Sequence, residues 1–153
     1  MTLAVAIREP YVRALGLISA AHFMSHFYGM VLPPLFPFLN ADLGISYTVL
    51  GILLAANKTV SGLCQLPAGV AVDRIGARSM LLFGLVACSV CIGLLGFISS
   101  PILLGIVIIA FGAANSVFHP TDYSILNSSV PEQHMAKSFS MHTFCGHIGT
   151  AVA

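Results

Sequence analysis

The sequence predicts an all-α, polytopic membrane helical bundle with four complete transmembrane helices and the start of a fifth. Of its 153 residues, 58% are hydrophobic and 7% are charged, whereas soluble domains carry roughly 25% charged residues. So few charges cannot form a water-soluble surface. The apolar residues lie in long runs separated by short polar connections, which is the pattern of membrane-spanning helices. The net charge of +1 indicates no nucleic-acid partner.

The five apolar segments follow one another closely along the chain. A membrane-spanning helix needs roughly 20 mainly apolar residues, and the segments lack the alternation of barrel strands, so helices are expected. The first is rich in proline at its outer end, the third has no charged residue, and Pro120 lies within the fourth. We expect the first and fourth helices to bend at these prolines. The helices are predicted at about residues 14–39, 48–72, 79–99, 102–129 and 138–153.

The basic residues of the connections fall on one side of the predicted bundle. Short connections make successive helices antiparallel, and no Lys or Arg then lies in a connection on the opposite side. By the positive-inside rule we expect a cytoplasmic N-terminus in a bacterial inner membrane or a plasma membrane. The first apolar run is too long for a signal-peptide core, so it is read as a retained helix. The residues that fix this orientation are Arg8, Arg13, Arg74, Arg78 and Lys137.

The four cysteines all lie inside apolar segments, at Cys64, Cys88, Cys91 and Cys145. Disulfide frameworks and zinc sites are typical of polar loops instead. Free cysteine is often buried as a small apolar side chain. We therefore expect no disulfide, no metal site and no cofactor.

The connection between the second and third helices carries a motif with a clear physical logic. It reads GVAVDRIGAR from Gly69 to Arg78. Gly69 would permit close approach of a neighbouring helix, and Gly76 would let the chain reverse. Asp73 could accept hydrogen bonds at a helix N-terminus, while Arg74 and Arg78 would face acidic groups or lipid phosphates. The pattern resembles the loop signature of the major facilitator superfamily, G-x-x-x-D-R-x-G-x-R, at the place where that family carries it.

Two further stretches extend this resemblance. Residues 131–138 read PEQHMAKS and resemble the connection after the fourth helix in the family, with Lys137 where Arg is more usual. The stretch from His119 to His142, with the proline-rich first helix, is similar to the fosmidomycin-resistance-like branch. The resemblance implies two six-helix bundles around one central substrate site that opens alternately to each side. It covers about the first five of twelve helices, so the C-terminal six-helix half would be missing from this chain.

Polar side chains form a stripe on the first, second and fourth helices. Strongly polar groups inside a membrane usually face a cavity or a partner, and in the family the first and fourth helices line the cavity. At a rise of about 1.5 Å per residue, His22 and Asp122 lie at similar depth, which predicts a contact between them. The stripes, at helical spacing, are His22, Ser25, His26 and Gly29; Asn57, Lys58, Ser61 and Gln65; and Asn115, His119 and Asp122.

These stripes supply two sets of candidate site residues. The proton-coupling candidates are Asp122, His119 and His22, because a carboxyl group can load and release a proton as its surroundings change and histidine titrates near physiological pH. The candidates for the substrate cavity are His26, Lys58, Asn57 and Asn115, and Lys58 would hold an anionic group of the substrate. The alternative is that these groups only satisfy one another and hold the helices together.

The sequence therefore predicts a secondary active transporter of a small organic solute, a drug or a metabolite, driven by an ion gradient and most simply by protons. It predicts no enzyme, and no phosphate-binding G-x-x-x-x-G-K-[ST] loop is present to support nucleotide-driven transport. Two alternatives remain open. One is a membrane redox protein whose buried histidines ligate haem, and the other is a membrane sensor with the same fold that does not transport.

Overall fold

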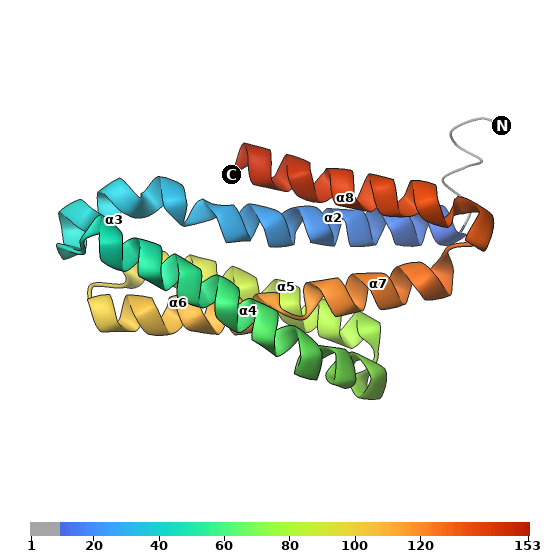
Figure 1. Ribbon diagram of the computed structural model, residues 1–153, viewed down its shortest axis with the longest axis horizontal. Helices are drawn as coiled ribbons and strands as arrows, with labels where there is room; N and C mark the ends of the chain where they lie inside the picture. Colours follow the sequence, from blue (N-terminus) through green and yellow to red (C-terminus); the bar gives the residue numbers. More distant parts are fainter. Residues whose placement is uncertain (1–9) are drawn as a thin grey trace.

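The computed structural model describes residues 10–153. All regular structure in this range is helical, and Figure 1 shows the main helices running side by side with their connections at the two ends of the bundle. The elements are α2 (Pro10–Val31), η1 (Pro33–Leu35), α3 (Phe36–Leu43), α4 (Tyr47–Ile75), α5 (Ala77–Leu94), η2 (Leu95–Phe97), α6 (Pro101–Asn115), α7 (Phe118–Ser129), η3 (Glu132–His134) and α8 (Met135–Val152).

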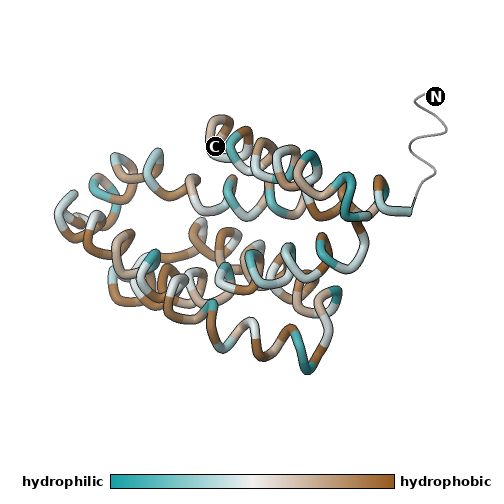
Figure 2. Tube along the Cα trace, turned by 45° about the vertical axis from the view of Figure 1, so that its right-hand side comes forward, coloured by the Kyte–Doolittle hydropathy of each residue, from teal (hydrophilic) through white to brown (hydrophobic). Residues whose placement is uncertain are grey.

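The predicted all-α membrane bundle is confirmed. Four helical stretches of the described residues are long and apolar enough to cross a membrane, at Pro10–Leu43, Tyr47–Ile75, Ala77–Phe97 and Pro101–Ser129. The second helix is longer than predicted because it continues through the motif to Ile75. Large apolar side chains cover the outside, with Phe97 86% and Leu66 82% exposed, and Figure 2 shows brown, hydrophobic segments on every helix. Such a surface is stable only in lipid.

Prolines interrupt the first membrane helix as expected. Proline has no amide hydrogen to donate, so regular α-helix ends at Val31 and a 3-10 turn follows at Pro33–Leu35. The chain resumes as α3 and ends at Gly44, whose φ of +66° is the left-handed conformation that glycine adopts readily. This bend forms the end of the bundle at the left of Figure 1.

The fourth membrane helix is divided in two. α6 ends at Asn115 and α7 begins at Phe118, so Ser116 and Val117 form the break. Pro120 lies one turn beyond and cannot donate to the carbonyl of Ser116. Hydroxyl groups bond the neighbouring carbonyls instead, since Ser116 donates to Ala113 and Thr121 donates to Val117. The irregularity predicted at Pro120 is therefore present one turn earlier, as a two-residue break at Ser116 and Val117, both of which keep right-handed helical angles.

Two layers of helices pack together to make the bundle. α8 packs along α2, while α4 packs mainly on α6, and α5 lies against α6 and α7. α8 approaches α2 closely at Gly146 and Gly149, because a Cβ atom on either residue would collide with α2. Movement of α8 away from α2 would break this close contact.

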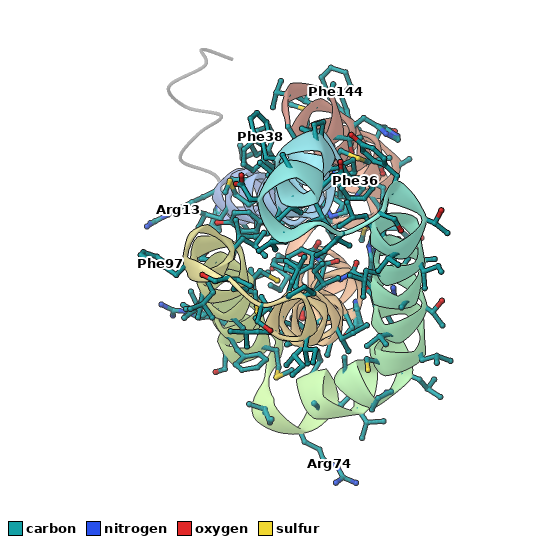
Figure 3. All side chains as sticks on the ribbon, turned by 90° about the vertical axis from the view of Figure 1, so that its left-hand side faces the viewer. Arg13, Phe36, Phe38, Arg74, Phe97 and Phe144 are labelled. Carbon is teal, nitrogen blue, oxygen red and sulfur yellow. The ribbon has the colours of Figure 1, made fainter. Side chains whose placement is uncertain are left out.

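One end of the bundle carries the basic residues. Arg13, Arg78 and Lys137 lie near the start of α2, α5 and α8, and Arg74 lies at the end of α4. Figure 1 shows these helix ends together at the right, and Figure 3 shows the side chains of Arg13 and Arg74 pointing outward. Arg8, which also enters the predicted orientation, lies outside the described residues.

Candidate functional site

A polar cavity opens between α2, α4, α7 and α8. Its volume is about 220 Å³, which is large enough for several water molecules or part of a small organic solute. The polar stripes predicted on three helices converge here. The polar residues that line it are Ser25, His26, Lys58, Ser61, Gln65, Asn115, His119 and Thr150.

Lys58 is the charged residue of this cavity, and no Asp or Glu is among its lining residues. The side chain crosses from α4 toward α2, where its Nζ lies 3.2 Å from the position that a Cβ on Gly29 would occupy. Glycine at position 29 thus leaves room for the ammonium group. Within residues 10–153, Lys58 has no ion-pair partner. The cavity is therefore electrostatically suited to an anionic group.

Asp122 lies deeper, behind the cavity, and contacts two histidines from two other helices. Its side chain is fully buried, and its Oδ2 forms a hydrogen bond with Nδ1 of His22 at 3.1 Å. This is the contact between α2 and α7 that the depth of the two residues predicts. On the other side, Nε2 of His142 in α8 lies 3.4 Å from the same oxygen. One carboxylate oxygen thus joins three helices.

His142 belongs to this site but is not among the candidate residues predicted from the sequence. Its pattern with Gly146 and Gly149, at i, i+4 and i+7, places it on the face of α8 that packs against α2. The ring is 1% exposed and stacks on His22 with 3.9 Å between ring centroids. The imidazole reaches Asp122 only because α8 packs against α2, and the sequence alone does not show which helix faces α8.

Two more histidines connect this cluster to the cavity. The ring of His22 lies 4.5 Å from that of His26 and 5.5 Å from that of His119, between centroids. His26 and His119 both line the cavity, and His26 also forms a hydrogen bond through Nδ1 with Thr150 at 3.1 Å. A continuous series of imidazoles therefore runs from the cavity to the buried carboxylate.

Several polar atoms of this cluster have no hydrogen-bond partner among the described residues. They are Oδ1 of Asp122, Nδ1 of His119 and both ring nitrogens of His142. A buried polar atom without a partner costs about 1–3 kcal/mol, and native structures contain few of them. Their concentration in one place indicates a site that is built to bind something.

The two asparagines among the cavity candidates have different positions. Asn115 lines the cavity and donates from Nδ2 to the carbonyl of Ser25 at 3.3 Å. Asn57 does not reach the cavity: it is buried and donates to the carbonyl of Ile108 in α6 at 2.7 Å. Asn57 thus links α4 to α6. It directly precedes Lys58, and consecutive residues of a helix point in different directions, so its side chain turns away from the cavity.

The signature loop lies far from the cavity, at the end of the bundle that carries the arginines. Gly76 has a φ of +97° and joins α4 directly to α5, so the expected reversal of the chain is confirmed. Asp73 is exposed and has no ion pair within residues 10–153. The N-terminus of α5 has no side-chain cap, so the expected bond from Asp73 is absent. At Gly69 a Cβ would lie 4.0 Å from Pro120, which is ordinary contact and does not require glycine.

The family follows from comparison with known proteins. A family model described as the Major Facilitator Superfamily matches residues 18–153. The chain belongs to this superfamily. It is therefore an integral membrane protein of a transporter family rather than an enzyme family, in agreement with the four apolar spanning helices.

Two curated relatives of this superfamily chain are similar to it. The probable L-galactonate transporter of Escherichia coli (strain K12) is 26% identical over 115 residues, which cover 75% of this chain and 25% of that protein. The uncharacterized MFS-type transporter YfnC of Bacillus subtilis (strain 168) is 27% identical over 130 residues, 78% of this chain and 31% of that protein. The chain thus spans less than a third of either relative. No solved structure matches it.

Proposed function

We propose that this chain is the N-terminal part of a secondary active transporter for a small organic solute that carries an anionic group. The observation that carries the proposal is Lys58 in a polar cavity whose lining contains no carboxylate. An ammonium group inside a membrane bundle is expensive unless it meets an opposite charge, and such residues mark substrate pathways. The position of the cavity between the helices of the bundle is typical of small-molecule sites.

The relatives support the same class of solute. One of the two similar proteins is named a probable L-galactonate transporter, and a galactonate ion combines a carboxylate with several hydroxyl groups. A solute of that kind would match the lysine and the hydroxyl, amide and imidazole groups of the cavity. The assignment to the fosmidomycin-resistance-like branch stays a prediction from the sequence.

Accumulation of such a solute requires an energy source, and we propose that a cation gradient supplies it through Asp122. This is the single carboxylate that the described residues place inside the bundle, away from both ends. A cation bound at Asp122 would pass between this carboxylate and the cavity by way of His22 and His119. Proton coupling, which is the simplest case, stays a prediction. We also propose the orientation with the arginine-bearing end in the cytoplasm, supported by Arg13, Arg74, Arg78 and Lys137.

Solute exchange in vesicles tests this function. The complete polypeptide would be reconstituted and preloaded with an unlabelled sugar acid, and the entry of the same solute in labelled form would be followed. We expect saturable entry for sugar acids and none for the corresponding neutral sugars. Equal entry of the acid and the neutral sugar would contradict the anionic class, and binding without entry for every solute would favour the sensor. A visible absorption band on the purified protein would favour the haem alternative.

A further inference from the structure

We propose that His22, Asp122 and His142 form a binding site for a divalent transition-metal ion of the Zn²⁺ class. This proposal departs from the sequence-based expectation of no metal site and goes beyond the transport of an organic solute. The three side chains come from α2, α7 and α8, and all are buried. Each offers one ligand atom, and the three atoms lie within 4.8 Å of one another.

The spacing of the donor atoms agrees with a shared ion. Zinc binds imidazole nitrogen and carboxylate oxygen at about 2.0–2.2 Å, so two ligands of one tetrahedral ion are about 3.3 Å apart. Oδ2 of Asp122 lies 3.1 Å from Nδ1 of His22 and 3.4 Å from Nε2 of His142. The two imidazole nitrogens would approach each other as the stacked rings turn toward the ion.

The unsatisfied atoms give a second and independent reason. Asp122 is 0% exposed and His142 is 1% exposed, yet Oδ1 of the first and both ring nitrogens of the second have no hydrogen-bond partner among the described residues. A neutral imidazole needs an acceptor for its N–H and a donor for its other nitrogen. A metal ion would occupy Nε2 of His142 and compensate the buried carboxylate charge at the same time.

The kinds of donor select the kind of metal. Two imidazoles and one carboxylate suit zinc, cobalt, nickel and iron(II), whereas magnesium and calcium prefer shells made of oxygen. His119 is not among the three grouped ligands, so the fourth position of the ion would stay open for a further molecule. Three protein ligands and an open position are also typical of zinc sites that bind a further molecule.

Metal binding to the purified complete polypeptide tests the proposal without any transport measurement. The protein would be stripped with a chelator and titrated with Co²⁺, whose visible absorption reports coordination, and then with Zn²⁺ in competition. We expect one ion per chain in the wild type. We expect His142→Ala to lower the affinity at least about tenfold, since loss even of supporting groups around metal sites costs 10–100-fold. His147→Ala is the matched control, because His147 is exposed on the same helix.

The result that overturns the proposal is a wild-type protein without stoichiometric Co²⁺ or Zn²⁺ binding, or unchanged affinity in folded His142→Ala. Either would show that the cluster holds only hydrogen bonds. If His142→Ala does not fold, Asp122→Asn replaces it, because asparagine conserves the volume and is a poorer ligand for these ions. Since no solute is present, failure of metal binding leaves the proposed transport untouched, and failure of solute exchange leaves the metal site untouched.

Discussion

Gly149 of α8 lies directly against the backbone of Phe23 in α2, with no room for a side chain between them. One turn earlier, Gly146 leaves a similar space for the ring of His22, whose Cδ2 and Nε2 would both be 2.7 Å from a Cβ at that position. This close approach brings His142 to Asp122. The position of the histidine cluster thus depends on two glycines as much as on its own polar groups.

The first prediction concerns this contact. Gly149→Ala would force α8 away from the backbone of Phe23, and overpacking of this kind costs about 1–3 kcal/mol. We expect a lower melting temperature in detergent. Gly51→Ala is the matched control, because a Cβ at that position in α4 meets nothing within 4 Å. Equal melting temperatures for Gly149→Ala and Gly51→Ala would show that α8 is not held in this way.

The second prediction concerns topology. In a variant without its native cysteines, single cysteines at Ala77 and Gln133 should react with an impermeant maleimide only from the cytoplasmic side. A cysteine at Ala41 should react only from the opposite side. The structure places the first two at the arginine-bearing end, while Ala41 lies in α3 at the other end. Labelling of positions 41 and 77 from the same side would contradict the predicted spans.

The third prediction concerns Lys58. Lys58→Ala should weaken the binding of an anionic solute by roughly tenfold or more, because hydrogen bonds to charged groups contribute about 1.5–3 kcal/mol. Lys137→Ala, which removes an exposed lysine at the start of α8, should leave binding unchanged. Direct binding measured by calorimetry is the appropriate readout. Unchanged affinity in Lys58→Ala would show that the anionic group of the solute does not bind at Lys58.

The fourth prediction separates accumulation from exchange. Asp122→Asn keeps the volume of the side chain and removes the charge that would attract a driving cation. We expect the variant to lose gradient-driven accumulation in vesicles and to retain exchange down the gradient of the solute. Asp42→Asn, at an exposed position near the end of α3, serves as the control. Accumulation at the wild-type level by Asp122→Asn would make Asp122 a structural partner of His22 and His142.

The fifth prediction concerns the signature loop. Asp73 is exposed and makes no ion pair within the described residues, so Asp73→Asn should change the free energy of unfolding by less than about 0.5 kcal/mol. We nevertheless expect slower transport, because Asn could not form the charge-assisted hydrogen bonds that Asp73 would make at the arginine-bearing end in another conformation of the transport cycle. Melting temperature and transport rate measured on the same preparation distinguish the two effects. Wild-type transport would show that the charge has no role.

Much of the fold and part of the site could be predicted from the sequence. The long apolar runs predicted the helices, because backbone groups in lipid must form their hydrogen bonds within the protein. The helical rise per residue predicted the contact of His22 with Asp122. The place of His142 could not be predicted in this way, since it depends on which helix α8 packs against. The same applies to Asn57, whose carbonyl partner lies 51 positions away in the chain.

The break at Ser116 and Val117 divides the fourth membrane helix into two parts that are held by different neighbouring helices. The first part, α6, is tied to α4 through the hydrogen bond from Asn57 and the close approach at Gly112. The second part, α7, is tied to α2 and α8 through Asp122. If α2 and α8 tilt relative to α4, the rotation is concentrated at these two residues. The wall of the cavity that carries Lys58 would then move relative to the wall that carries His26 and Thr150.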